Sequence, residues 1–418
     1  MSAKIQAPRG TFDVLPEQAA ARAGLEAAAR KVLERAGYGR IETPTFEATE
    51  LFARGVGEST DVVQKEMYTF DDGGGRSITL RPEVTAPICR AYVEHGMHKS
   101  AQPVRLWYLS SCFRHEAPQA GRYRQFWQVG AEAIGSEDPA VDAELVLLLA
   151  ELLDDLGVGG LRLRISSLGG PDTRAAYRED LQRHLREHAD ALAPEVRERL
   201  ELNPLRAWDS SHGGTQAVMA TAPRLLDRLE GEDAEHFAEV RALLDGAELD
   251  YDIDPTLVRG LDYYTRTVFE FESSALGAQS GVGGGGRYDG LVAALGGPET
   301  PGCGWAAGIE RMLLAAERPP TAPAPVDLFV AYAAPAHRRA AFRVATEARQ
   351  AGLGAQLELA GRSLKGQLKQ ADRVGARFVA ILGDDGAALK DMESGEQEDI
   401  AAAAIVPGVL RGRGGFGL

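Results

Sequence analysis

Cysteine is scarce in this chain of 418 residues, which contains only Cys89, Cys112 and Cys303. The three are far apart and form no C-x-x-C pair, so the sequence predicts buried reduced thiols and neither a disulfide framework nor a metal site held by protein ligands. Long apolar runs are also missing, because "LVLLLAELLDDLG" is interrupted by three acidic residues and the N-terminal residues contain no apolar signal core. We therefore expect a cytoplasmic protein without membrane spans.

Basic residues are in the minority, with 46 Lys and Arg against 61 Asp and Glu and a formal net charge of −15. This charge argues against diffuse binding of a polyanion, because most of the surface repels phosphate groups. The excess of acidic residues is unevenly distributed. Residues 326–418 carry 12 basic and 11 acidic side chains, whereas residues 1–325 carry 34 basic and 50 acidic side chains. The charge distribution therefore leaves room for a local basic surface in the C-terminal part.

The length and the order of the predicted elements indicate more than one domain. Residues 15–37 have the composition of a helix, and Asp138 is placed to cap a second helix that ends near Gly157. Between them "RIETPTFE" (40–47) predicts a strand interrupted by Pro44, and "DDGGG" (71–75) predicts a hairpin turn. The segments 103–116 and 122–135 predict a further pair of strands. This pattern is typical of an α+β domain with a mainly antiparallel sheet.

The pattern becomes helical from about residue 172 to residue 246, and strand-like sequence returns near residue 251. The part after the Pro-rich stretch "ERPPTAPAP" alternates strands and helices, as a small α/β domain does. We therefore predict a first domain of residues 1–322 interrupted by a helical insertion, 170–248, then a Pro-rich linker, 317–325, and a C-terminal α/β domain, 326–418.

The glycine-rich segment "SGVGGGGRYDG" (280–290) allows three interpretations. It contains G-x-G-x-x-G, but no clear strand-to-helix unit surrounds it, as a dinucleotide site requires. The second interpretation is a tight connection between strands. The third is that the glycines let the backbone approach a ligand, with Arg287 and Tyr288 beside it.

Arginines occur in two further segments that could bind phosphate. "FRHEAPQAGRYRQF" (113–126) places Arg114, Arg122 and Arg124 around a short loop, with Phe126 available to stack on a base. "GCGWAAGIERMLLA" (302–315) places Arg311 just inside a helix that follows two turns of small residues. Taken singly, the first segment is better explained as a solvated charged hairpin, and Arg311 as a surface arginine.

The combination of these segments resembles the catalytic core of a class II aminoacyl-tRNA synthetase. "LVRGLDYYTRTVFEF" (257–271) and "GGGGRYDGL" (283–291) are similar to the two segments peculiar to the histidyl-tRNA synthetase family. "RGTFDVLP", "TLRPE", "FRHEAPQAGRYRQFWQ" and "GIER" fall in the order and spacing of that family. The resemblance covers nearly the whole chain.

The resemblance implies that ATP activates L-histidine to histidyl-adenylate, with release of pyrophosphate, and that the histidyl group then passes to the 3′ end of its tRNA. Catalytic roles on the α-phosphate fall to Arg114 and Arg259. Mg²⁺ is implied on the β- and γ-phosphates. The ATP-binding residues implied are Arg114, Glu116, Arg122, Phe126 and Arg311. The histidine-binding residues implied are Glu83, Thr85, Gln128, Glu132, Tyr263, Tyr264 and Tyr288.

The same resemblance implies a homodimer, because Pro44 lies in the motif that forms the dimer interface of class II enzymes. It also implies that residues 326–418 bind the anticodon. Three residues depart from common family residues: Val84 replaces glycine, Ala117 replaces arginine and Trp127 replaces histidine.

Two rival functions follow from the same fold. One is a non-catalytic paralogue that regulates ATP phosphoribosyltransferase, but such proteins typically lack the C-terminal domain and the arginine of R-G-L-D-Y-Y. The other is a tRNA-binding module on an inactive core, in which the arginines would be eroded. This sequence keeps both the C-terminal domain and the arginines, which argues against both rivals.

Overall fold

The computed structural model of this protein describes residues 4–57, 60–258, 260–277, 280–317, 326–384 and 386–413, without the side chains of Asp209 and Arg413. The chain divides into two compact units, residues 1–320 and 321–418, and each is described by itself. The predicted Pro-rich linker lies outside the described residues except for Glu317. Within the described ranges, no helix is both long and apolar enough to cross a membrane.

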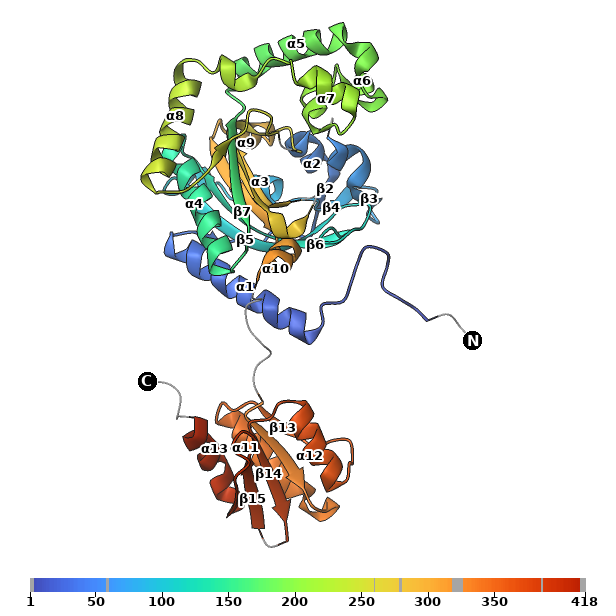
Figure 1. Ribbon diagram of the computed structural model, residues 1–418, viewed down its shortest axis with the longest axis vertical. Coiled ribbons are helices and arrows are strands. Elements are labelled where there is room, and N and C mark those ends of the chain that lie inside the picture. The colour runs from blue at the N-terminus through green and yellow to red at the C-terminus, as the bar shows by residue number, and fades with distance from the viewer. Residues whose placement is uncertain are drawn as a thin grey trace. The chain divides into compact units, whose positions relative to one another are not determined.

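Unit 1 is built on an eight-stranded sheet with the strand order β1-β5-β6-β11-β10-β9-β7-β8 (Figure 1). The five pairs from β5 to β7 are antiparallel, and the two outer pairs, β1 with β5 and β7 with β8, are parallel. The predicted mainly antiparallel sheet is therefore confirmed. Its strands are β1 (Gly39–Arg40), β5 (Val104–Phe113), β6 (Gln125–Ile134), β7 (Leu161–Ser167), β8 (Asp252–Ile253), β9 (Thr265–Ser273), β10 (Gly281–Arg287) and β11 (Gly302–Gly308).

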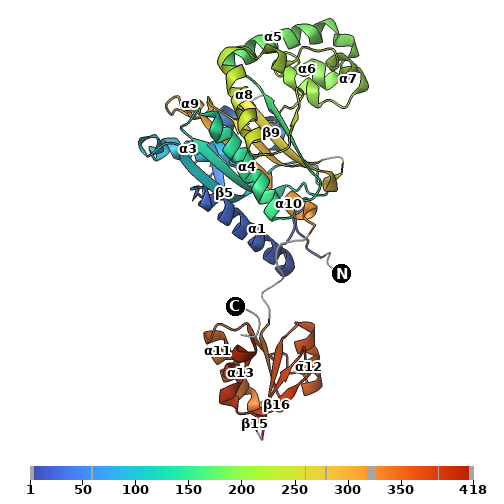
Figure 2. The same ribbon diagram turned by 60° about the vertical axis from the view of Figure 1, so that its left-hand side comes forward.

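Helices cover one face of this sheet closely. In α1, the buried Leu25, Ala29, Val32 and Leu33 recur every three or four residues, and they pack against the sheet together with α4 and α8. Asp138 caps α4 as predicted, since its side chain accepts a hydrogen bond from the backbone N–H of Ala140 at 2.9 Å. Figure 2 shows α4 and α8 side by side. The helices of unit 1 outside the insertion are α1 (Pro16–Arg35), α2 (Thr49–Val56), α3 (Thr85–Glu94), α4 (Pro139–Asp155), α9 (Leu291–Ala294) and α10 (Ile309–Ala315).

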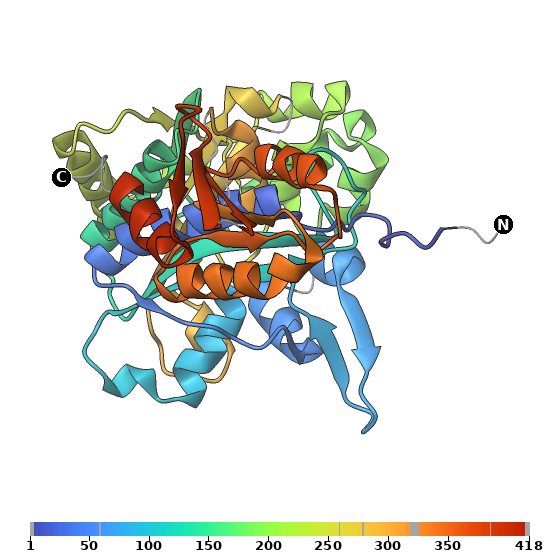
Figure 3. The ribbon, with the colours of Figure 1, turned by 90° about the horizontal axis from the view of Figure 1, so that it is seen from below.

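The segment 40–47 does not form one strand interrupted by proline. Its first residue ends β1, and its last residues belong to β2 (Phe46–Ala48), which pairs in a separate three-stranded sheet of order β2-β4-β3. The segment therefore passes from one sheet to another. The predicted hairpin is confirmed as β3 (Tyr68–Asp71) and β4 (Ser77–Leu80), the light-blue pair of strands in Figure 3.

The glycine-rich segment is neither a loop nor a tight connection, because residues 281–287 form the strand β10 inside the sheet. The expected small-residue turns of residues 302–308 are likewise a strand, β11, which pairs with β10 and β6. Glycine is needed here because neighbouring atoms leave no room for a Cβ. A Cβ at Gly285 would collide with the carbonyl oxygen of Gly304, and one at Gly304 would collide with the carboxylate of Glu132.

Between β7 and β8 the chain forms only helices among its regular elements. They are α5 (Pro171–Glu187), α6 (Pro194–Arg199), α7 (Gly213–Met219) and α8 (Gly231–Gly246), with short 3-10 turns between them that include η4 (Pro204–Asp209). The helices α5 to α7 share a small core of their own around Tyr177, Leu181 and Leu185. Figure 2 shows these three helices grouped at one end of unit 1. We keep the name helical insertion for residues 170–248.

Unit 2 is an α/β domain with a five-stranded sheet of order β13-β12-β14-β15-β16. The helices α11 and α13 pack on one face of this sheet and α12 packs on the other. The hairpin β15–β16 extends the sheet beyond the strands that the sequence predicts. The elements are β12 (Leu328–Tyr332), α11 (Arg338–Gln350), β13 (Ala355–Leu357), α12 (Leu364–Arg373), β14 (Phe378–Gly383), β15 (Gly386–Asp391), β16 (Gln397–Ile400) and α13 (Ile405–Arg413).

Candidate active site

Two adjoining cavities lie on the face of the large sheet opposite α1, α4 and α8. The first has a volume of about 380 Å³ and the second about 660 Å³. They share a wall formed by Arg114, Glu116, Arg122, Gln128 and Ala306. A cavity of several hundred cubic ångströms with converging polar groups is typical of a small-molecule site.

Strand alternation explains why polar groups gather on this face. In β6, Val129, Ala131 and Ala133 point into the core under the helices, so Gln128 and Glu132 point to the other face. In β9, Phe269 and Phe271 belong to the same core, which leaves the intervening Glu270 on the cavity side. The sheet is therefore apolar on its covered face and polar at the cavities.

The first cavity collects most of the predicted histidine-binding residues. The rings of Tyr263 and Tyr264 lie 4.7 Å apart between centroids, and Tyr263 meets Tyr288 edge to face at 5.8 Å. These tyrosines make a compact aromatic wall, since such tilted contacts are favourable. The predicted residues that line the first cavity are Glu83, Thr85, Gln128, Tyr263, Tyr264 and Tyr288.

Glu132 lies behind this wall and is fully buried. Its two carboxylate oxygens accept hydrogen bonds from the hydroxyls of Tyr288, at 2.6 Å, and Thr85, at 2.7 Å. Burial raises the pKa of Glu132 to about 8, and the two hydrogen bonds oppose this rise. Glu132 alone among the predicted and described site residues lines neither cavity.

Glu83 is the second buried carboxyl group, with 3% of its surface exposed. Its side chain accepts hydrogen bonds from the backbone N–H groups of Thr85, at 2.8 Å, and Ala86, at 3.0 Å, at the start of α3. Burial raises the pKa of Glu83 to about 7, although these bonds and the charge of Arg114 lower it. The Glu83 carboxyl group is therefore bonded to the start of the helix and also lines the first cavity.

The second cavity contains the predicted stacking partners Phe126 and Arg311. The Nε of Arg311 donates to the carbonyl oxygen of Gly281 in β10, which fixes the guanidinium at the wall. Burial is the main cause that lowers the pKa of Arg311, and the nearby charge of Arg122 acts in the same direction. A planar cation and an aromatic ring in one cavity suit a flat heterocycle.

The shared wall carries an open cluster of charges. Arg114 donates from Nε to the carbonyl oxygen of Pro82 at 2.9 Å, and its Cζ lies 5.4 Å from the ring centroid of Phe126. Glu116 is 3.8 Å from Arg114 and 3.4 Å from Arg122. These long ion pairs leave guanidinium N–H groups free to bind an anionic ligand.

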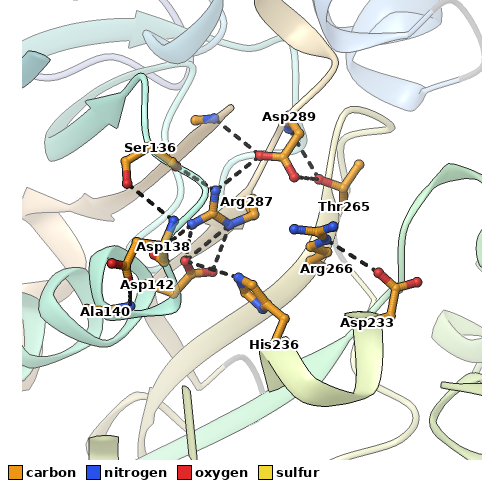
Figure 4. A network of polar contacts seen from close by, with 11 residues as sticks. Ser136, Asp138, Ala140, Asp142, Asp233, His236, Thr265, Arg266, Arg287 and Asp289 are labelled. Atoms are coloured by element: carbon orange, nitrogen blue, oxygen red, sulfur yellow. Dashed lines mark hydrogen bonds and ion pairs between the residues drawn. The ribbon is translucent and has the colours of Figure 1, made fainter. Parts of the chain in front are cut away.

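Arg287 does not face either cavity, contrary to the interpretation that placed it beside a ligand. It is fully buried and bonds the carboxylate of Asp142 through Nε and Nη2 and the carbonyl oxygen of Ser136 at 2.8 Å (Figure 4). The Nε2 of His236 lies 3.7 Å from the same carboxylate. Arg287 thus joins β10 to α4 inside the protein, and Asp142 brings His236 of α8 to the same cluster.

Arg259, predicted as catalytic, lies outside the described residues. The first cavity also contains residues that sequence reasoning missed, among them Tyr108 and Arg206. The hydroxyl of Tyr108 is buried and has no hydrogen-bond partner among the described residues. Alternation along β5 from the buried Trp107 could have indicated Tyr108, whereas no local signal places Arg206, which belongs to the helical insertion, at this site.

The three departures from common family residues have different positions. Val84 is buried, precedes α3 and lines the first cavity. Ala117 is exposed in the loop between β5 and β6. Trp127 lies under the guanidinium of Arg22, whose Cζ is 4.2 Å from its ring centroid. Only Val84 therefore contacts the candidate site directly.

Comparison with known proteins follows the same division of the chain. The family model described as histidyl-tRNA synthetase matches residues 10–312, and the model described as anticodon binding domain matches residues 327–411. Together the two models span both compact units.

Curated relatives match over nearly the full length of the chain. The histidine–tRNA ligase of Halorhodospira halophila is 49% identical and that of Geobacillus thermodenitrificans 48% identical, each over 94% of this chain and 95% of the relative. The crystal structure of apo histidyl-tRNA synthetase from S. aureus has a TM-score of 0.81 and 38% identity, and it covers 97% of this chain and 100% of that chain. The chain therefore belongs to the histidyl-tRNA synthetase family.

Proposed function

We propose that this chain is a cytoplasmic histidine–tRNA ligase, which activates L-histidine with ATP and transfers the histidyl group to the 3′ end of its tRNA. The observation that carries the proposal is the pair of adjoining cavities. One holds the buried carboxyl group of Glu83 and the tyrosines, the other holds Phe126 and Arg311, and both open onto Arg114. An amino acid and a nucleotide bound in the two cavities would meet at that arginine.

The first cavity offers groups that fit each part of histidine. Glu83 accepts the α-ammonium, with Thr85 and Gln128 beside it. The imidazole lies among Tyr263, Tyr264 and Tyr288, and Tyr264 meets one ring nitrogen. A site with paired polar contacts rejects ligands that lack them far better than an apolar pocket does.

Glu132 binds the other ring nitrogen in this proposal. When Glu132 is ionised, each of its carboxylate oxygens has a second lone pair beyond the one used by Thr85 or Tyr288, so it can accept a further N–H. The unpaired hydroxyl of Tyr108 adds one more polar contact at the same wall.

The second cavity is assigned to ATP. Adenine lies between Phe126 and Arg311, and Glu116 and Arg122 contact the nucleotide. Mg²⁺ enters with ATP as part of the substrate, on the β- and γ-phosphates. In the described part of the chain no group of three or more His, Cys, Asp and Glu residues is placed to hold a metal ion. Glu270 and Glu272, which line this cavity, are both engaged by Arg164, at 3.2 and 2.9 Å.

Activation is a displacement at the α-phosphorus. A carboxylate oxygen of histidine forms a bond to phosphorus, the bond between phosphorus and the α–β bridging oxygen breaks, and pyrophosphate leaves with the electron pair. Negative charge grows on the α-phosphate oxygens in the transition state, and Arg114 and Arg259 stabilise it. In the second step a terminal ribose hydroxyl attacks the histidyl carbonyl carbon, releases its proton and displaces AMP.

Transfer requires recognition of the tRNA, and unit 2 is the proposed anticodon-binding domain. The match of residues 327–411 to an anticodon-binding family model supports this assignment. The near balance of charge in residues 326–418, within an acidic chain, is compatible with contact to RNA.

We also propose that the chain forms a homodimer through the sheet β2-β4-β3. Register places Phe46 opposite Leu80 and Phe70 opposite Ile78, so these four side chains share one face of the sheet. Phe46 and Phe70 are 53% and 46% exposed. Sedimentation equilibrium tests the assignment: the unmodified chain should be a dimer and Phe46→Asp should weaken association, whereas an unchanged dimer would place the interface elsewhere.

Histidine-dependent exchange of pyrophosphate into ATP tests the activity, since it requires no tRNA. Exchange with histidine, absent with other amino acids, is the expected result. A folded chain without exchange would instead favour the non-catalytic regulator of ATP phosphoribosyltransferase. Arg259→Ala should lower the exchange rate on the order of 10²- to 10³-fold, and an unchanged rate would refute its role.

A further inference from the structure

The segment 260–264 reaches the first cavity from the helical insertion's side of the molecule, and it is held there by the insertion. The Nη1 of Arg174, in α5, donates to the carbonyl oxygens of Asp262, at 2.9 Å, and Tyr264, at 2.7 Å. These two carbonyls flank Tyr263. One guanidinium nitrogen therefore fixes the backbone on both sides of a residue that lines the cavity.

Two further residues of the insertion contact the same segment. The Nδ2 of Asn203 donates to Oδ1 of Asp262 at 3.1 Å, and the Nη2 of Arg206 donates to the carbonyl oxygen of Gly260 at 3.1 Å. The segment has no regular secondary structure of its own. Its position therefore depends on partners outside the segment. Of the three in the insertion, Arg174 and Arg206 bond its backbone and Asn203 bonds the side chain of Asp262.

The end of the insertion that carries Arg174 is itself fixed to the sheet. Asp233, at the start of α8, accepts hydrogen bonds from the N–H of Gly170 and the hydroxyl of Thr173, both at 2.7 Å. The Nε of Arg266, in β9, lies 3.3 Å from the same carboxylate (Figure 4). The first turn of α5 is thus tied to the strand that directly follows Tyr264.

The buried position of Arg174 is explained by its hydrogen bonds to the segment 260–264. Burial lowers its pKa, and the hydrogen bonds recorded for its side chain go to neutral carbonyl oxygens. Removing a guanidinium from water costs free energy, and the charge of Asp262, in the same segment, offsets only part of this cost. The gain from this arrangement is geometric, because two carbonyl oxygens accept from one planar, rigid donor group.

We propose that the helical insertion is a working part of the histidine site and that Arg174 is its positioning residue. Arg174 holds the carbonyls of Asp262 and Tyr264 so that the side chains of Tyr263 and Tyr264 face histidine. The inference rests on the proposed function of the first cavity. Misplacement of a binding group by about 1 Å can lower a rate on the order of 10²-fold, so loss of this bond should be measurable.

The test compares Arg174→Met with Arg178→Met in the full-length chain by pyrophosphate exchange. Arg178 lies one turn further along α5 and also donates to two carbonyl oxygens, those of Glu201 and Leu202, at 2.9 and 2.6 Å. Its bonds stay within the insertion, so it is a matched control. Arg174→Met should raise the KM for histidine by at least about tenfold, with the KM for ATP unchanged, whereas Arg178→Met should leave both constants unchanged.

Arg174→Lys keeps a cationic donor and should restore part of the histidine affinity. If Arg174→Met fails to fold, Arg174→Lys and Asn203→Ala carry the test, each with a smaller increase in the KM for histidine. An unchanged KM in the folded Arg174 variants would overturn the proposal, and so would equal effects of Arg174→Met and Arg178→Met. Absence of exchange in the unmodified chain is a different result, because it would refute the proposed function itself.

Discussion

The two cavities of the candidate site differ in how much of their binding geometry exists before any ligand arrives. At the first, the buried Thr85 and Tyr288 both donate to Glu132, which lies behind the cavity wall. At the wall shared with the second, Arg122 is 44% exposed and Glu116 forms only long ion pairs. The first cavity is suited to selecting one ligand by fixed hydrogen bonds, and the second to attracting charge.

Removing charge from the shared wall should have the largest effect. Arg114→Gln is expected to lower the rate of adenylate formation on the order of 10²- to 10³-fold, since the α-phosphate loses a cation in the transition state. Rapid-quench measurement of the first turnover gives this rate. Arg105→Gln, at the other end of β5, should leave it unchanged, and equal losses in both variants would point to damage of the strand.

Changes to the hydrogen bonds of Glu132 should mainly affect the binding of histidine. Glu132→Gln keeps the size of the side chain but leaves one of the two hydroxyl donors without its acceptor, so the KM for histidine should rise by about 10- to 100-fold. Steady-state exchange measures this, with the KM for ATP as the internal reference. Tyr288→Phe should produce a smaller rise, because Thr85 still bonds the carboxyl group. Unaltered discrimination against other amino acids would contradict the assignment of Glu132.

The buried carboxyl groups should make the stability of the free protein depend on pH. The folded chain keeps the proton of Glu132 up to a pH near 8, its raised pKa, whereas an unfolded chain releases it near 4.5. Between these values the unfolded state binds fewer protons, so stability falls as pH rises. Relative to Glu132→Gln, the unmodified chain should lose about 1 kcal/mol from pH 6 to pH 7.

Denaturant unfolding at the two pH values measures that loss. The contribution of the protonated group is complete below about pH 4.5 and is lost as the pH passes through 8. Identical pH dependence of the two proteins would show that Glu132 is ionised in the empty site.

A change in salt concentration should affect the two cavities differently, and this is the smallest of the expected effects. Raising the ionic strength from about 0.05 to 0.3 M shortens the screening length to a few ångströms, and the exposed arginines lose part of their attraction for phosphate. The KM for ATP should rise about two- to threefold while the KM for histidine stays nearly constant. An equal rise in both KM values would contradict the distinction between a first cavity with fixed hydrogen bonds and a second with exposed charges.

The strands and helices that surround the site were largely predictable, because their signals are local. Asp138 and Pro139 mark the start of α4, and the hairpin of β3 and β4 follows from its glycine turn. The strands β10 and β11 were not predictable, because glycine normally weakens a strand. Glycine is necessary there only because neighbouring backbone atoms and Glu132 leave no room for a side chain. The residues of the first cavity came from resemblance to a family rather than from periodicity.

The sequence by itself determined the family and the mainly antiparallel sheet, because these depend on residue types in order along the chain. It also predicted which groups would bind histidine and ATP. Only the tertiary structure decided which polar groups reach the cavities. Arg287 and Tyr288 are adjacent in the sequence, yet Arg287 is buried against Asp142 while Tyr288 faces the first cavity. Arg174 and Tyr264 are 90 residues apart and share a hydrogen bond of 2.7 Å. Side-chain direction at the end of a strand, and contact between distant segments, are fixed by packing and not by local sequence.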